Sequence, residues 1–276
     1  MCLSIFMEVM QVLNLPLLKR TIKTNGKLWL ECTGFLVLLM LLALGLYHPD
    51  TGQGRIFRWI PEALAMVLGI HMEAAGLTEY LGSCLFGFFY PVTAMIYGAV
   101  AANSLMAKQV ESGTMGYYLA SPNKRGRIAN TQAYFLLMSL FVMFLCTALV
   151  GILGCVLRFP GKLEISQFLL LHIGTLCLSI CLSGISFFIS CLSDESSRSL
   201  ALGAGIPALF FLLRMLADTG ESLGLLRFAT VFTLFQTADV LGDSLSICWK
   251  FPLLAVLGFA LFRGGIYLFE KRDLPL

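Results

Sequence analysis

Long apolar stretches separated by short polar ones run through the whole chain. Residues 128–157 and 165–193 carry no formal charge over 30 and 29 residues. A bilayer core of ~30 Å needs ~20 helical residues to cross, so each stretch is long enough to span a membrane. We therefore predict an all-α integral membrane protein with a single membrane domain over residues 1–276 and six transmembrane helices. The predicted spans are 28–47, 84–107, 128–157, 165–193, 199–217 and 250–269.

The composition agrees with this pattern and excludes several classes of function. Hydrophobic residues make up 58% of the chain and charged residues 13%, against ~25% charged residues in soluble domains. The net charge of +3 is small, and the basic residues follow the membrane sides, so we expect no nucleic acid ligand. The nine cysteines are scattered, without a CxxC pair, so we expect no disulfide framework and no metal site.

Basic residues are distributed unevenly between the two sides of the predicted membrane. Eleven fall on the side of the termini and six on the opposite side, with Arg214 and Arg263 inside spans. Cytoplasmic loops carry an excess of Lys and Arg, so both termini are expected in the cytosol and the protein in the plasma membrane. The eleven are Lys19, Arg20, Lys23, Lys27, Lys108, Lys124, Arg125, Arg127, Arg198, Lys271 and Arg272.

The segment before the first span is amphipathic. Residues 1–27 combine apolar positions such as Leu15 and Ile22 with a basic end, which is typical of a helix that lies on the inner headgroups. We predict a cytosolic elbow helix here; the alternative is a flexible basic tail.

The loop between the second and third predicted spans, residues 108–127, has the pattern of a docking element. Gly113 breaks the preceding helix, and Met115, Tyr118 and Leu119 then share one face at helical spacing. Ser121 and Pro122 restart a helix, since Ser is a good N-cap and Pro is tolerated at the first helical position. A short amphipathic helix of this kind suits a groove on a partner.

Two motifs of this loop resemble the signature of type-2 ATP-binding-cassette exporter permeases. They are Glu111-Ser-Gly-Thr114 and Leu119-Ala-Ser-Pro122, the latter followed by basic residues, and the chain end 267–275 is also similar to that of many such permeases.

The resemblance implies a non-catalytic permease subunit that moves its substrate outward. It implies a separate ATPase subunit that binds ATP and Mg²⁺, and a second permease copy or paralogue that completes a dimer. It also implies short re-entrant or interfacial outer helices between spans five and six. The ATPase-coupling residues would be Glu111, Gly113, Thr114, Met115, Tyr118 and Leu119.

Motifs of intrinsic catalysis are missing from the sequence. There is no G-x-x-x-x-G-K-[ST] loop and no H-E-x-x-H pair, so neither ATP binding of the P-loop kind nor zinc-protease chemistry is expected. An ion-coupled carrier would place carboxylates near the membrane midplane, and none occurs there. Glu31 and Arg263 lie toward the inner leaflet, where each either joins the other in an ion pair or extends to the headgroups. No catalytic residue is predicted.

Polar residues recur along the predicted fourth span at spacings of three and four, which places them on one helix face. They are His172, Thr175, Ser179, Ser183, Ser186 and Ser190. Small hydroxyl residues of this kind support close helix packing. The functional alternative is a wall of the substrate path, formed by Thr175, Ser179, Ser183 and Ser186.

Three functions compete on the sequence alone. The first is the exporter subunit described above. The second is a non-transporting membrane receptor or immunity subunit that binds a peptide or partner. The third, an integral-membrane enzyme, is disfavoured because buried pairs of His or carboxylate residues are missing from the spans. The transported substrate is not specified by any motif.

Overall fold

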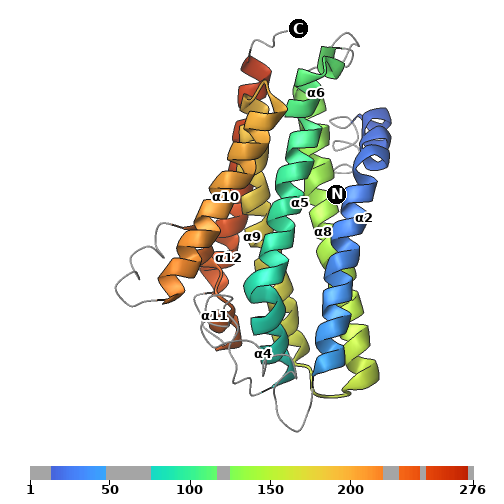
Figure 1. Cartoon of the computed structure of the whole chain (residues 1–276), viewed down its shortest axis with the longest axis vertical. Helices are drawn as coiled ribbons and strands as arrows, with labels where there is room; N and C mark the ends of the chain where they lie inside the picture. The colour runs from blue at the N-terminus through green and yellow to red at the C-terminus, as the bar shows by residue number, and fades with distance from the viewer. Residues whose placement is uncertain (1–13, 48–75, 117–124, 220–229, 243–246, 273–276) are drawn as a thin grey trace, which may run out of the picture.

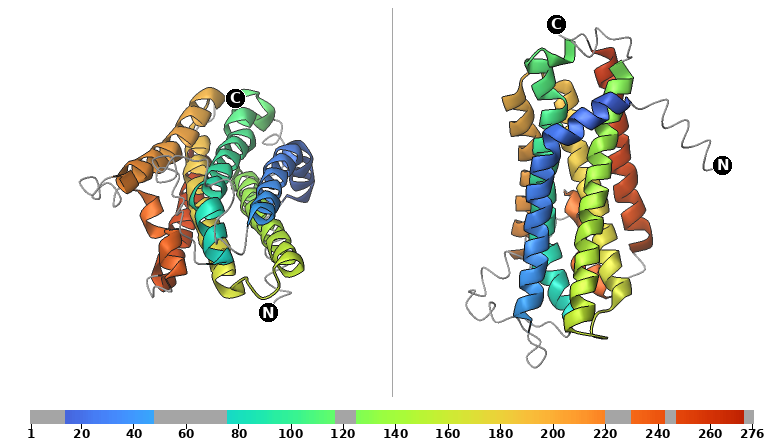
Figure 2. Two further views of the ribbon diagram at one scale, coloured as in Figure 1. Left: turned by 60° about the horizontal axis from the view of Figure 1, so that its bottom comes forward. Right: turned by 90° about the vertical axis from the view of Figure 1, so that its right-hand side faces the viewer.

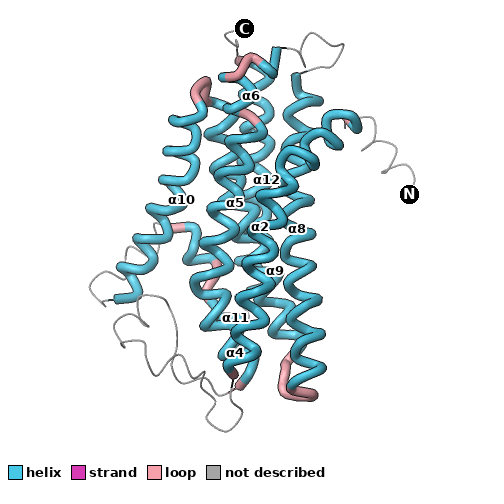
Figure 3. The backbone as a smooth tube through the Cα atoms, turned by 45° about the vertical axis from the view of Figure 1, so that its right-hand side comes forward, coloured by secondary structure: helices cyan, strands magenta, loops and turns pink. Residues whose placement is uncertain are grey.

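The computed structural model describes residues 14–47, 76–116, 125–219, 230–242 and 247–272 as a bundle of long helices (Figures 1 and 3). Six helices or helix runs are long and apolar enough to cross a membrane, and no strand occurs in these ranges. The predicted all-α architecture with six transmembrane helices is therefore confirmed. The runs are α2 (Leu15–Leu46), Leu77–Glu111, α8 (Arg125–Arg158), α9 (Ile165–Leu192), α10 (Ser196–Thr219) and α12 (Ile247–Lys271).

Helix α2 begins well before the predicted first span and changes direction along α8. Two of its contacts lie on neighbouring residues of α8: the Asn14 backbone N–H donates to Thr131 Oγ1 (3.0 Å), and Thr21 Oγ1 donates to Gln132 Oε1 (3.1 Å). The Trp29 indole then donates to the carbonyl of Ser139 (2.9 Å). The first two turns of α2 therefore cross α8 at a steep angle, and the rest runs along it (Figure 2). The assignment of residues 1–27 to a cytosolic elbow stays a prediction, and residues 1–13 lie outside the described ranges.

The second span is assembled from four helical segments. Helix α4 (Leu77–Leu81) leads into a π-helix, η2 (Gly82–Phe89), followed by α5 (Tyr90–Leu105) and α6 (Ala107–Glu111). Pro91 lies at the start of α5; a proline lacks the backbone N–H and clashes with the carbonyl four residues earlier. The wider π turn before Pro91 accommodates this break in the α-helical hydrogen bonds.

Helix α9 lies at the centre of the bundle and contacts its neighbours through small residues. A Cβ atom added to Gly258 of α12 would lie 3.0 Å from the backbone nitrogen of Cys181, and one added to Gly265 would lie 3.2 Å from the Cα of Phe188. Glycine therefore allows the α9 and α12 backbones to approach closely, as in other membrane helix pairs.

Two short helices lie at the end of the bundle opposite to α6, near the start of α12 (Figure 1). They are η4 (Val231–Leu234) and α11 (Thr237–Leu241), and Asp239 of α11 forms an ion pair with Lys250. They fall in the part of the chain where short outer helices were predicted. Their place relative to the bilayer stays a prediction, and residues 220–229 and 243–246 lie outside the described ranges.

Candidate functional site

Glu111 ends the second span at the end of the bundle that also holds the last turn of α12 (Figure 1). The helix changes direction just before it, because Met106 adopts φ −120° and ψ −75° between α5 and α6. Gly113 follows with φ +69°, a left-handed conformation that glycine adopts without steric cost. These two breaks change the direction of the chain on both sides of Glu111.

The Glu111 carboxylate contacts the beginning of the fifth span. Its Oε2 accepts a hydrogen bond from the backbone N–H of Ser196 (3.3 Å), the first residue of α10. A carboxylate at this place satisfies one of the free N–H groups of the helix and interacts favourably with the positive end of its dipole. Asn103 Nδ2 donates to Ser196 Oγ (2.9 Å), so two residues of the second span hold the start of α10.

Residues after Glu111 fold back onto the bundle. The hydroxyls of Ser112 and Thr114 lie 2.7 Å apart, and residues 114–116 form one helical turn. Met115 is 0% exposed and belongs to the apolar core. The sequence placed Met115 on an exposed docking face; here its side chain instead anchors the loop to the protein. Tyr118 and Leu119 lie outside the described residues, so their role stays a prediction.

A second connection at this end links the last span to the loop between α9 and α10. Arg272 forms an ion pair with Asp194 in that loop, and its Nη1 donates to the carbonyl of Cys191 (3.1 Å). Arg125, at the start of α8, donates in turn to the carbonyl of Arg272 (2.7 Å). The loop 193–195 is therefore held by α12 on one side, while the first residue of α10 is held by the second span.

The six polar residues that form the stripe on α9, from His172 to Ser190, are all buried inside the chain. Ser186 Oγ donates to the carbonyl of Gly203 on α10 (2.7 Å), and Ser190 Oγ lies 2.8 Å from Ser199 Oγ. Thr175 and Ser179 donate to carbonyls of their own helix, to Leu171 (2.7 Å) and Thr175 (2.6 Å) respectively. These contacts support the packing alternative for the stripe, and its role as a substrate path stays a prediction.

Ser183 differs from its neighbours in the stripe. Among the described residues its Oγ has no hydrogen-bond partner, and a Cβ added to Gly98 of α5 would lie only 2.2 Å from it. Helices α5 and α9 therefore meet at this pair of small residues. His172 lies closer to the other end of α9, with its ring 4.5 Å from that of Phe168 and 4.8 Å from that of Phe86, measured between centroids.

The comparison with protein families agrees with this arrangement of six apolar helices and a polar connection at one end. The family model described as ABC-2 family transporter protein matches residues 8–274, nearly the whole chain. The chain belongs to the ABC-2 transporter family. The resemblance read from residues 111–122 is thereby confirmed at the level of the family, and the protein is a multi-pass membrane permease. Among curated proteins, none matches the chain.

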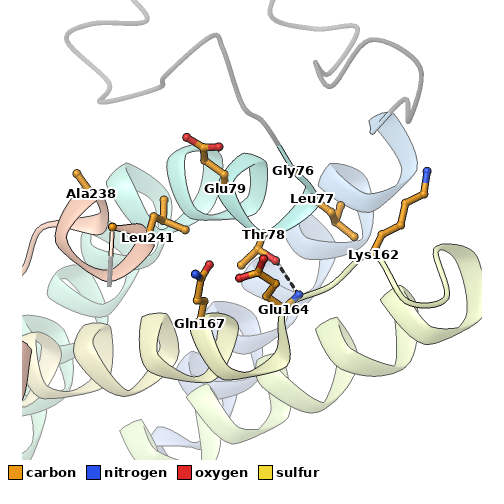
Figure 4. A pocket seen from close by; sticks show the side chains of 10 residues that line it. Gly76, Leu77, Thr78, Glu79, Lys162, Glu164, Gln167, Ala238 and Leu241 are labelled. Atoms are coloured by element: carbon orange, nitrogen blue, oxygen red, sulfur yellow. Dashed lines mark hydrogen bonds between the residues drawn. The ribbon is translucent and has the colours of Figure 1, made fainter. Parts of the chain in front are cut away.

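The opposite end of this ABC-2 permease contains a cavity of about 590 Å³ between α4, the start of α9 and α11 (Figure 4). Its wall carries the charged side chains of Glu79, Lys162 and Glu164, and the backbone N–H of Glu164 donates to Thr78 Oγ1 (3.0 Å). The cavity is therefore mixed in polarity and borders the polar surface at this end of the spans.

Sequence reasoning identified Glu111 but not the other residues that connect the helices at this end of the bundle. Ser196 and Asn103 were not singled out, and Arg272 was considered only for its charge. A Ser-rich start of a span, 196–199, is an N-terminal helix signal, but nothing in a single sequence pairs it with a carboxylate 85 residues earlier.

Proposed function

We propose that this chain is the membrane-spanning subunit of an ATP-driven exporter, and that it couples to a separate ATPase subunit through residues 108–127. The observation that carries the proposal is the hydrogen bond between Glu111 and the start of α10. This hydrogen bond joins the proposed docking segment, residues 108–127, to the fifth span, α10. Membership of the ABC-2 family supports the same conclusion.

The coupling step in this proposal is mechanical. ATP and Mg²⁺ bind to the partner ATPase, whose closure displaces the segment that contains Gly113 and Thr114. Because Glu111 and Asn103 both contact Ser196, a displacement of the second span also moves the start of α10. Rigid helices transmit such a shift along their length, so that two packings of the bundle alternate.

A second permease copy or paralogue completes the substrate path in this proposal. Many apolar side chains of α5, α10 and α12 face outward in the isolated chain, among them Ile96, Leu202 and Val256. In a membrane, such side chains are covered either by lipid or by a second helix bundle. The walls of the path within this chain, including Thr175, Ser179, Ser183 and Ser186, are a prediction of the same proposal.

The proposed orientation places both termini and residues 108–127 in the cytosol of the cell and residues 48–75 outside. Single cysteines at Asn123, Gly52 or Gly220 in a variant that lacks the nine native cysteines test this orientation. In intact cells, cysteine 123 is expected to react only with membrane-permeant maleimides, and cysteines 52 and 220 also with impermeant ones. Labelling of cysteine 123 by an impermeant reagent would contradict the orientation.

Association with the ATPase is expected to depend on Tyr118. A buried aromatic anchor contributes ~2 kcal/mol or more to an interface, about a thirtyfold change in affinity. Tyr118→Ala is therefore expected to reduce the amount of ATPase recovered with the tagged permease from membranes. Tyr267→Ala is the matched control, because Tyr267 is an exposed tyrosine near the end of α12. Equal recovery with both variants would contradict docking through Tyr118.

A further inference from the structure

An apolar groove lies between α2 and α8, next to the basic residues in the first half of α2. Its volume is about 370 Å³, and its lining is almost entirely apolar, with Ile22, Tyr134 and Met138 among the side chains that face it. All three are exposed in the chain. The groove therefore opens toward the surroundings of the bundle rather than into its core.

The change of direction of α2 creates this groove. The first two turns of α2 cross α8 near Thr131 and Gln132, while the later turns run along it to Ser139. Three hydrogen bonds between side chains and the facing helix fix this crossing, so the space in the angle is a stable feature of the fold. Gly26 lies at the wall, and a Cβ atom there would meet nothing within 4 Å.

Two exposed lysines of α2 are the sequence neighbours of residues that line the groove. Trp29 also lines the groove, with the indole N–H bound to the carbonyl of Ser139 (2.9 Å). Lys19 and Lys23 follow the groove residues Leu18 and Ile22 by one position each, and both lysines are exposed. An apolar groove whose lining helix also carries two exposed lysines on the same turns matches a molecule with an acyl chain and a negatively charged head.

We propose that the groove binds an anionic phospholipid, with one acyl chain between α2 and α8 and the phosphate group near Lys19 and Lys23. Charge complementarity argues for this occupant, since clusters of basic residues beside a membrane span attract anionic headgroups. The amphipathic ring of Tyr134 at the groove suits the region between headgroups and acyl chains. The bound lipid holds the start of α2 against α8.

Filling the groove with a side chain tests the site directly. The full chain is purified in detergent and titrated with palmitoyl-oleoyl phosphatidylglycerol or phosphatidylcholine, and native mass spectrometry measures the first bound lipid. Gly26→Leu is expected to weaken phosphatidylglycerol binding about tenfold. Gly34→Leu is the matched control, because Gly34 is an exposed glycine of the same helix that also has nothing within 4 Å of a Cβ atom and does not line the groove.

The contribution of the two lysine charges is tested separately, with substitutions of these exposed residues. Lys19→Gln combined with Lys23→Gln is expected to remove the preference for phosphatidylglycerol over phosphatidylcholine. Unchanged lipid binding in Gly26→Leu would overturn the site. A preference that persists in the double lysine variant would overturn the anionic headgroup. Normal lipid binding together with loss of a second permease copy in Gly26→Leu would show a protein interface instead and would also overturn the proposal.

Discussion

A side chain at position 98 is expected to force α5 and α9 apart and to destabilise the permease. The Cβ atom of Gly98→Ala would lie 2.2 Å from Ser183 Oγ, 3.0 Å from its Cβ and 3.2 Å from its Cα. Overpacking of this kind costs ~1–3 kcal/mol, and Gly98→Val adds two further methyl groups. The thermal midpoint and the yield of monodisperse protein measure the loss.

The contact also predicts its own suppressor. Ser183→Gly removes the two closest atoms, so Gly98→Ala combined with Ser183→Gly is expected to recover most of the lost stability, as a double-mutant cycle reveals. Gly34→Ala is the control, because its Cβ would meet nothing within 4 Å. If Gly98→Ala is as stable as Gly34→Ala, the close approach of α5 and α9 is not required.

A substitution of Ser183 distinguishes a packing role of the stripe from a role in the substrate path. Ser183→Ala removes only an Oγ atom that has no hydrogen-bond partner among the described residues, so stability is expected to remain close to that of the unaltered protein. A change in transport at unchanged stability would support Ser183 as a wall of the path. Normal transport would leave the stripe with the packing role that its other contacts support.

Glu111→Ala is expected to uncouple ATP hydrolysis from transport while the ATPase remains bound. The variant loses the acceptor for the Ser196 N–H, and a contact at a helix start contributes ~1 kcal/mol. If this contact exists in only one of the two alternating packings, its loss shifts their ratio about fivefold. Substrate-stimulated ATP hydrolysis in reconstituted vesicles is expected to fall by a similar factor.

Two variants control for the charge and the place of Glu111. Glu111→Gln keeps an oxygen acceptor and is expected to retain more coupling than Glu111→Ala. Glu195→Ala removes a carboxylate from the neighbouring loop, where Glu195 binds Arg198 (2.8 Å) within one turn, and is expected to have little effect. Equal losses in Glu111→Ala and Glu195→Ala would contradict a specific role for Glu111.

The sequence predicted the number and type of the membrane helices because charged residues mark where apolar spans end. The predicted third span ended at residue 157, and α8 ends at Arg158. The start of the first helix was less predictable: α2 begins at Leu15, whereas the predicted span begins at residue 28. Lys and Arg are good helix formers, so the basic residues before the span belong to the same helix as the span itself.

Features that depend on contacts between distant segments were not predictable in this way. The spacing of Met115, Tyr118 and Leu119 indicates that they share a face, but spacing alone does not say whether the chain's own core covers that face. For Met115 it does. The pairing of Glu111 with Ser196 likewise requires the positions of two spans in space, which a single sequence does not contain.

The π-helix at Gly82–Phe89 affects how this chain compares with other members of its family. A π turn holds about one residue more than an α turn, so a homologue with an ordinary α-helix here needs one residue fewer for the same contacts on both sides. A correct alignment would then place a gap inside a transmembrane segment, where gaps are normally avoided. An alignment without that gap would pair every residue between Leu77 and Leu81 with the wrong residue of the homologue, one position away from its structural equivalent.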